Sequence, residues 1–373
     1  MLRGYQDCRY EEDHDFTGFE TDIKPIAFYL PQFHPIPEND LWWGKGFTEW
    51  TNARKALPRY PGHYMPRVPH KSIGYYDLSD YRVIEVQAAL AARHGIYGFC
   101  FYTYWFSGKR LLEKPVDLLL QHPEVPIHYC LCWANENWTK RWDGQESNVL
   151  MRQDYREEDP EHFILDMKQY LEDPRYIRID GKPLLMVYAP RSIPDPATVF
   201  RRWRETAVRS GIGEIYIAIC RTFRETAKSL GILDAVDAEV EFPPHVDSIE
   251  PCAEIIKTSG DDSFIRSYST VMHEWRYDAS PKPVFRSVMM AWDNSARRRD
   301  GWHSFADFTQ RDYVLWIRKA MRDLRKNLPK DKRFLFVNAW NEWCEGTYLE
   351  PDEKYGYMSI NALSRTIFNL RRT

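Results

Sequence analysis

Apolar, β-branched or aromatic runs recur along this chain, and amphipathic stretches separate them. Runs that are continuously apolar, rather than alternating, are typical of parallel strands buried on both faces. Helical patterns that end at Gly or Pro lie between the runs. The eight strand candidates are 25–30, 97–105, 127–134, 183–189, 214–220, 235–242, 283–292 and 333–340, and the clearest helix candidates are 81–95, 160–174, 196–211 and 311–328.

This alternation predicts an α/β fold, a single (β/α)8 TIM barrel with long loops at the C-terminal face of the strands. We expect residues 23–373 to form the catalytic barrel and the charged, turn-rich residues 1–22 to form an N-terminal surface arm. The helix pattern is weakest at 225–231, and prolines indicate loop in 243–264. An open doubly wound sheet is the alternative, but no Gly-x-Gly-x-x-Gly follows the first strand.

Charge and hydropathy exclude several classes of function. The 373 residues include 51 Lys+Arg and 54 Asp+Glu, a formal net charge of −3, so no overall basic field favours nucleic acid as a partner. The apolar stretches fall short of the roughly 20 residues of a membrane-spanning helix, and the N-terminus lacks the apolar core of a signal peptide. We therefore expect no membrane insertion and, for the chain as written, a cytoplasmic location.

Motifs for metal, phosphate and serine-hydrolase chemistry do not occur in the sequence. There is no P-loop and no Gly-x-Ser-x-Gly, and no two histidines have the spacing of a transition-metal site. We expect no cofactor and no transition metal, while an oxygen-ligated Ca²⁺ stays open. Five cysteines in apolar runs are expected to be reduced, buried thiols: Cys100, Cys130, Cys132, Cys220 and Cys344.

Aromatic residues make up 15% of the chain, and many of its 14 tryptophans adjoin acids and amides. Flat CH-rich surfaces flanked by hydrogen-bonding groups are what a sugar-binding cleft requires. We therefore expect an oligo- or polysaccharide as the partner. The tryptophans predicted to wall or support the cleft are Trp42, Trp43, Trp133, Trp138, Trp340 and Trp343.

Glu342 and Glu345 are the first candidates for catalysis. They follow the last apolar run, and glycoside cleavage needs two carboxyl groups, one as acid and one as base or nucleophile. Mutual repulsion and the surrounding aromatic residues would raise the pKa of one of them into the range of a general acid. The alternative is a pair of solvated loop glutamates.

Other strand ends supply candidate sugar contacts. Glu136 could orient sugar hydroxyls, act as a catalytic carboxylate, or bond to backbone at its strand end. For Glu49, His34 and Asp293, a place in the site and a bracing role in a loop are equally open. The predicted substrate-binding residues are Glu136, Asn135, Trp138, Trp43, Glu49, His34, Tyr102, Tyr104, Trp105, Tyr188, Glu241, Trp292, Asp293, Asn341 and Trp343.

Four blocks of the sequence, at 29–50, 97–117, 130–144 and 338–351, resemble the glycoside hydrolase family 99-like domain. That domain is also known as the WbsX-type glycosyltransferase family of polysaccharide and lipopolysaccharide loci. The resemblance implies a (β/α)8 barrel, in agreement with the strand count. Family 99 proper contains retaining endo-α-1,2-mannosidases.

The resemblance also implies roles for the two glutamates. The catalytic pair of the family lies in a Trp-Asn-Glu-Trp-x-Glu-Gly segment, which corresponds here to Glu342 and Glu345. Glu342 would act as base on the substrate 2-hydroxyl, giving an anhydro-sugar intermediate. Glu345 would be the acid for departure and the base for water. Cys344 and the long 130–144 block depart from the mannosidases, so the identity of the sugar does not carry over.

We expect a glycoside hydrolase that acts on a microbial polysaccharide or O-antigen-like glycan. A glycosyltransferase of polysaccharide assembly and a non-catalytic glycan-binding barrel are the alternatives. No Asp-x-Asp or Gly-rich phosphate loop stands at a strand end, which favours hydrolysis or transglycosylation over transfer from a sugar nucleotide. The sequence leaves the sugar, its linkage and the oligomeric state open.

Overall fold

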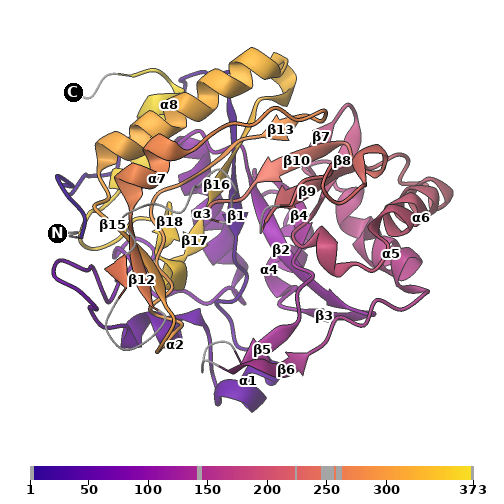
Figure 1. The fold of residues 1–373 in the computed structure, drawn as a ribbon, viewed down its shortest axis with the longest axis horizontal. Helices are drawn as coiled ribbons and strands as arrows, with labels where there is room; N and C mark the ends of the chain where they lie inside the picture. The colour runs from indigo at the N-terminus through magenta and orange to yellow at the C-terminus, as the bar shows by residue number, and fades with distance from the viewer. Residues whose placement is uncertain (1–3, 141–144, 223–224, 245–255, 258–262, 371–373) are drawn as a thin grey trace.

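The structure is a computed structural model that describes residues 4–140, 145–222, 225–244, 256–257 and 263–370. Parallel strands form a barrel that helices surround (Figure 1). The barrel strands are β1 (Lys24–Tyr29), β2 (Gly98–Phe106), β4 (His128–Trp133), β8 (Lys182–Val187), β9 (Tyr216–Arg221), β10 (Ala238–Glu241), β13 (Val284–Phe285), β14 (Ser287–Met289) and β16 (Phe334–Asn338).

The strands pair in the order β13-β10-β9-β8-β4-β2-β1-β16-β14, and every pair along this path is parallel. Its two ends, β13 and β14, are separated in the chain only by Arg286. The seventh strand is therefore divided between two neighbours: Val284 pairs with Glu239 of β10, and Val288 pairs with Val337 of β16. The barrel is nearly closed, which confirms the predicted fold.

The strands bury consecutive residues, as strands covered on both faces should. All six residues of β8 except Lys182 are buried, and the same holds for β1 apart from Lys24. This continuous burial explains why the strands appeared in the sequence as unbroken apolar runs.

The long helices around the barrel are amphipathic. In α8 (Gln310–Asn327) the buried residues include Trp316, Ala320 and Leu324, four apart, and Thr309 caps the helix by accepting a hydrogen bond from the amide of Asp312. The other helices in this layer are α3 (Tyr81–Arg93), α4 (Lys114–Gln121), α5 (Asp159–Leu171), α6 (Pro196–Arg209), α7 (Tyr268–Glu274) and α9 (Met358–Ile367).

The weakest predicted helix, at 225–231, does not form. Among the described residues between β9 and β10, the one regular element is a short 3-10 turn, η3 (Leu233–Ala235). The side chains of Thr226 and Ser229 bond to each other's backbone amides, which competes with helical hydrogen bonding in a short segment. The predicted 243–264 loop lies largely outside the described residues.

Extra elements gather at the C-terminal ends of the barrel strands. Figure 1 shows α1, α2 and the β5–β6 hairpin together at the lower end of the molecule. A second small sheet, β11-β12-β15, stands beside them. The bounds are α1 (Pro37–Trp43), α2 (Glu49–Lys55), β5 (Trp138–Lys140), β6 (Gln145–Met151), β11 (Ile256–Lys257), β12 (Phe264–Ser267), β15 (His303–Ala306), β17 (Asn341–Glu342) and β18 (Thr347–Tyr348), with β3 (Lys109–Leu111) and β7 (Arg178–Ile179) as short edge strands.

Residues 4–22 contain no helix and no strand, and they pack against the barrel. Phe16 is buried, and the ring of Tyr5 stacks on that of Tyr355 with 5.3 Å between centroids. The carboxylate of Glu11 accepts hydrogen bonds from Arg365 and from the amide of Asn361. These contacts connect the segment to α9.

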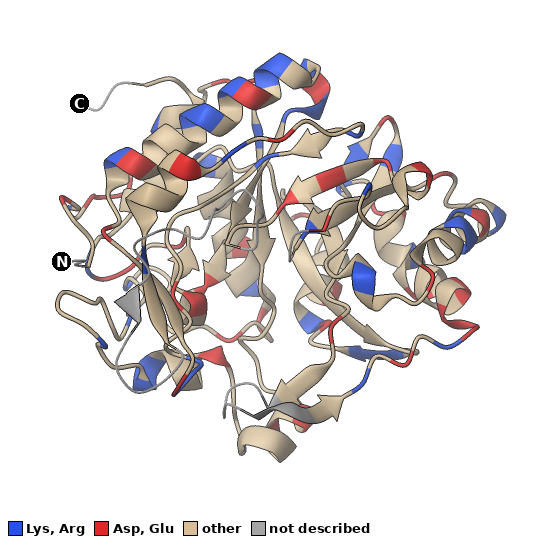
Figure 2. Ribbon diagram, in the orientation of Figure 1, with Lys and Arg blue, Asp and Glu red and all other residues tan. Residues whose placement is uncertain are grey.

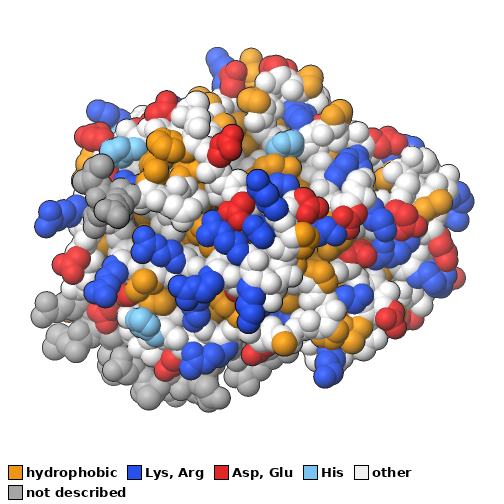
Figure 3. Space-filling view, turned by 90° about the horizontal axis from the view of Figure 1, so that it is seen from above, with side chains coloured by type: hydrophobic (Ala, Val, Ile, Leu, Met, Phe, Trp, Pro, Cys, Tyr) orange, Lys and Arg blue, Asp and Glu red, His pale blue; other side chains and the backbone are white. Residues whose placement is uncertain are grey.

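The surface carries both signs of charge. Figure 2 shows acidic and basic side chains interspersed over α8 and the other outer helices, and in Figure 3 basic side chains gather in the middle of the upper face with acidic ones around them. Throughout the described residues, no helix has the length and apolar character that crossing a membrane requires. The five cysteines expected in the core are buried and form no disulfide.

The Glu11 contacts predict that replacing this residue destabilises the fold. Burial opposes ionisation of Glu11, but hydrogen bonds from Arg365 and Gln310 outweigh it and lower the pKa of the carboxyl. Glu11→Ala should therefore cost about 1–3 kcal/mol of unfolding free energy at neutral pH, measured by denaturant titration. Glu12→Ala, which removes an exposed carboxylate, is the matched control. An equal loss in both variants would contradict this account.

Candidate active site

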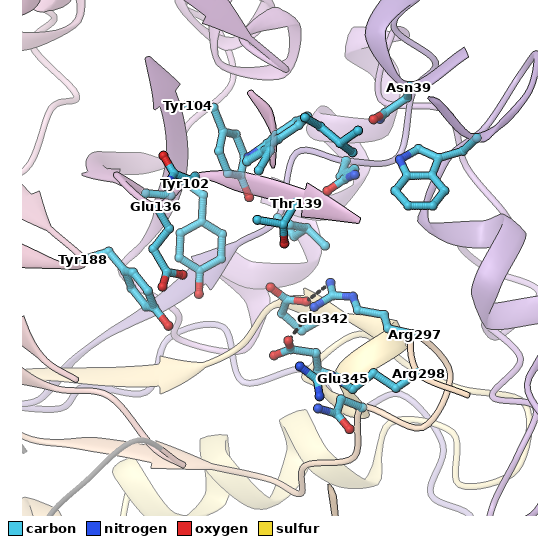
Figure 4. Close-up of a pocket in the computed structure, with 18 of the residues that line it drawn as sticks. Asn39, Tyr102, Tyr104, Glu136, Thr139, Tyr188, Arg297, Arg298, Glu342 and Glu345 are labelled. Carbon is cyan, nitrogen blue, oxygen red and sulfur yellow. Dashed lines mark hydrogen bonds and ion pairs between the residues drawn. The ribbon is translucent and has the colours of Figure 1, made fainter. Parts of the chain in front are cut away.

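A pocket of about 560 Å³ opens among the loops at the C-terminal ends of the strands, where (β/α)8 enzymes hold their active sites. Aromatic, acidic and amide side chains from most of the strand ends meet in it (Figure 4). Its lining residues are Leu30, Gln32, Asn39, Trp42, Trp43, Tyr102, Tyr104, Ala134, Glu136, Asn137, Trp138, Thr139, Leu150, Tyr188, Phe242, Pro244, Trp292, Asn294, Arg297, Arg298, His303, Glu342 and Glu345.

The guanidinium of Arg297 joins three carboxylates at the pocket. Its Nη2 lies 2.8 Å from Glu342 Oε2 and 3.1 Å from Glu49 Oε1, and its Nη1 donates to Glu345 Oε1. Arg297 follows β14, Glu49 begins α2 after β1, and the other two glutamates follow β16. One cation from the loop after β14 therefore gathers acids from two other strand ends.

Three carboxylates around one guanidinium leave an excess of negative charge in a buried place. Burial is the main cause that raises the pKa of Glu342, to about 8, and the charges of Glu345 and Glu49 add to it while Arg297 opposes it. The side chain of Glu342 is 6% exposed. In the free protein Glu342 is thus the group that holds a proton at neutral pH.

Glu345 is the more accessible member of the pair, with 25% of its side chain exposed. Both of its oxygens accept hydrogen bonds: Oε1 from Arg297, and Oε2 from the indole of Trp292 at 3.0 Å. Two donors fix the direction of the carboxylate toward the pocket. Figure 4 shows both glutamates pointing into the cavity from the side of Arg297.

An asparagine immediately before Glu342, and another immediately before Glu136, fixes the backbone from which each of these two glutamates projects. The amide of Asn341 bonds both the N–H and the carbonyl of Leu30, at 2.8 and 3.0 Å. The amide of Asn135 bonds the N–H and carbonyl of Ala189 in the same way, each at 2.8 Å. Each pair extends the hydrogen bonding between neighbouring strands beyond their ends, so Glu342 and Glu136 start from rigid positions.

The glycine that ends the Trp-Asn-Glu-Trp-x-Glu-Gly segment is required by a close contact. Gly346 has φ +61°, and a Cβ there would lie 2.3 Å from the guanidinium of Arg67, which donates to the Gly346 carbonyl. Arg67 lies 3.5 Å from Asp293, whose backbone N–H donates to the carbonyl of Glu345 at 2.6 Å. His63 also bonds the Asp293 carboxylate. This buried group holds the Glu345 backbone from behind.

Glu136 stands across the pocket from the pair. Figure 4 places its carboxylate beside the hydroxyl ends of Tyr102 and Tyr188. The ring of Tyr104 meets that of Trp138 edge to face, with 5.0 Å between centroids. This wall thus offers an acid, phenol hydroxyls and aromatic faces.

Among the predicted site residues, the structure brings nine to the pocket wall. They are Glu342, Glu345, Glu136, Trp138, Trp43, Tyr102, Tyr104, Tyr188 and Trp292. Trp42, predicted as a wall, also lines it.

Trp105 does not line the pocket, because side chains alternate along a strand. Tyr102 and Tyr104 face the pocket from β2, whereas the indole of Trp105 faces α5 and donates to Asp166 at 2.6 Å. The sequence analysis assigned Tyr102, Tyr104 and Trp105 to the pocket together, without distinguishing the two faces of the strand.

The other predicted contacts are buried behind the wall. Asn135, Asn341, Glu49 and Asp293 brace the site as described above. His34 bonds the Pro31 carbonyl at 3.0 Å. Glu241 accepts a hydrogen bond from Arg286 at 2.9 Å. The indole of Trp343 donates to Glu350 at 2.7 Å, and the indole of Trp133 donates to the Trp105 carbonyl at 3.1 Å. Trp340 is fully buried.

The arginine that binds the three carboxylates was not predicted from the sequence. Arg297, Arg298 and His303 line the pocket, and the only signal for them is the run of three arginines, 297–299, in the loop after the seventh strand. Asn39 was also missed. In the part of the chain that the structure describes, no three His, Cys, Asp or Glu side chains are arranged to hold a metal ion.

The fold and the site define a (β/α)8 barrel with a glutamate pair at the end of its eighth strand. A family model described as Glycosyltransferase WbsX matches residues 25–363, and the chain belongs to this family. It is 40% identical over 351 residues to an uncharacterised protein, WxcX, in two strains of Xanthomonas campestris pv. campestris. That match covers 92% of this chain and 49% of WxcX, so the chain spans about half the length of these relatives.

Solved glycosidase structures share the fold. The GH99 endo-alpha-mannosidase from Bacteroides thetaiotaomicron superimposes with TM-scores of 0.54 and 0.53 in two structures, at 14% and 15% identity, over 92% of this chain and 97% and 95% of theirs. A glycoside hydrolase-like protein gives a TM-score of 0.61 at 13% identity, over 97% of this chain and 98% of its own. At these identities the similarity is one of fold.

The contact between Gly346 and Arg67 predicts that Gly346→Ala destabilises the protein and displaces Glu345. Gly181 is a matched control, because it also has positive φ (+77°) but nothing within 4 Å of an added Cβ. Gly346→Ala should cost about 1–3 kcal/mol more than Gly181→Ala, measured by denaturant titration. Equal costs would show that the arginine yields and that the contact is unimportant.

Proposed function

We propose that the protein is a glycoside hydrolase that cleaves a microbial polysaccharide or O-antigen-like glycan by carboxylate acid/base catalysis. The observation that carries this proposal is the arrangement of Glu342 and Glu345. Both project into one pocket and both bond the same guanidinium. Two carboxyl groups on one side of a cleft with aromatic walls are what glycoside cleavage needs.

The roles of the two glutamates follow the family resemblance. Glu342 is the base on the substrate 2-hydroxyl, so in the active form the one proton of the pair lies on Glu345 and Glu342 is ionised. Glu345 is the acid for the departing sugar and then the base for water. Its greater exposure, 25% against 6%, suits a group that meets both the leaving oxygen and the incoming water.

The second candidate is transfer of a sugar rather than hydrolysis, and the description of the family favours it. A sugar-nucleotide donor brings a diphosphate, which needs cationic partners. Arg297 already binds three carboxylates, so this guanidinium has little spare positive charge for a diphosphate. We therefore rank transfer second, and non-catalytic glycan binding third.

Assigning catalysis to Glu342 and Glu345 predicts how their glutamine variants behave. In a screen that digests bacterial polysaccharides and weighs the products, Glu342→Gln and Glu345→Gln should each lower turnover by about 10²–10⁴-fold while glycan binding persists. Glu353→Gln, at an exposed glutamate of the same strand-end region, should keep full activity. Full activity in both site variants would refute the assignment of catalysis to Glu342 and Glu345. If neither the wild type nor any variant cleaved a glycan, non-catalytic glycan binding would be the remaining function.

The shared charges predict a pH profile. The active form holds one proton on the pair, so kcat/KM falls as pH rises through about 8, where the pair loses that proton. Glu49 does not line the pocket, but its charge raises the pKa of Glu342, so Glu49→Gln should move this falling limb to lower pH. Glu353→Gln should not move it. A limb unchanged or moved upward in Glu49→Gln would contradict the electrostatic account.

A further inference from the structure

Asn39 is a buried amide that the proposed chemistry does not use. It lies in α1, it is 0% exposed, and it lines the pocket. Among the described residues, neither its Nδ2 nor its Oδ1 has a hydrogen-bond partner. Leaving both ends of a carboxamide unpaired in the interior is costly, and most buried polar groups in proteins are paired. Within the described residues the amide has no protein partner, so its two polar atoms are available to a ligand in the pocket.

The surroundings of Asn39 are aromatic. Trp42 and Trp43 follow it in α1, and the ring of Trp42 meets that of Trp138 edge to face at 5.9 Å. Figure 4 shows Asn39 on the far side of Thr139 from Glu342 and Glu345. In this view the Asn39 amide lies away from the two glutamates, in the same pocket.

The chemistry of a carboxamide narrows the ligand. Its oxygen accepts and its NH2 donates along one edge, so it is satisfied by two neighbouring groups of which one donates and one accepts. Adjacent hydroxyls of a pyranose do this, because each can play either role, while the CH face of the ring packs on an indole. An extended acetamido group fits less well, since its N–H and C=O point in opposite directions.

We propose that Asn39, Trp42, Trp43 and Trp138 form a second sugar subsite, in which the Asn39 amide binds two adjacent hydroxyls of a pyranose. The substrate then spans at least two sugar units, with one at the glutamate pair and one at this subsite. The inference rests on the proposed function only in taking the ligand to be a glycan. Asn39 lines the pocket, so the sugar meets its amide from the pocket side.

Asn39→Leu separates a ligand-binding amide from a structural one, because it keeps the size of the side chain and removes both polar atoms. A ligand-binding amide that is unpaired in the free protein contributes no hydrogen bond to its stability, so the Tm of Asn39→Leu should be unchanged or higher. Asn361→Leu is the matched control. Asn361 is equally buried and its Nδ2 donates to Glu11 and Glu12, so the same replacement there should lower the Tm.

Sugar binding is measured by saturation-transfer NMR with the methyl glycosides of glucose, galactose and mannose. At least one should bind the wild type and Asn361→Leu alike, and its affinity for Asn39→Leu should be at least about tenfold lower. Equal binding by Asn39→Leu, a lowered Tm in that variant, or no signal from any of the three sugars would overturn the subsite. Binding that depends on Asn39 in a protein that cleaves no glycan would support the subsite while refuting hydrolysis.

Discussion

The guanidinium of Arg297 lies among three carboxylates, and the geometry of the candidate site depends on this contact. Glu49, Glu342 and Glu345 would repel one another in a buried place without it. Their side chains are 0%, 6% and 25% exposed, so water cannot replace the missing cation for the two more buried acids. The arginine permits the carboxylates to stand together, while burial, together with the excess of negative charge, raises the pKa of Glu342.

The same contact joins parts of the barrel that lie next to each other where the seventh strand is divided. Arg297 comes from the loop after β14, and the acids come from the loops after β1 and β16. These three strands are neighbours in the sheet, in the order β1-β16-β14. Behind them, Asn341 ties β17 to Leu30, and Arg67 holds Gly346. The site is therefore braced by polar contacts between strand ends, on a barrel whose interior is apolar.

The fold could be predicted from sequence because buried parallel strands produce unbroken apolar runs, which are easily told from amphipathic helices. The prediction failed at 225–231, where Thr226 and Ser229 bond locally in a way that helical spacing does not reveal. Glu342, Glu345 and Glu136 could be placed at the pocket because each lies in the loop that follows the end of a barrel strand. Trp105 could not be placed correctly without the register of β2, and Arg297 could not be recognised because its partners are 248, 45 and 48 residues away in the chain.

The measurement that tests the account most directly is digestion of a susceptible polysaccharide in oxygen-labelled water, followed by mass analysis of the new reducing ends. Hydrolysis by the glutamate pair predicts that one labelled oxygen enters each cleaved end in the wild type and that none enters with Glu345→Gln. Products that carry no label, because the sugar has passed to another glycan, would contradict hydrolysis and favour the transferase alternative.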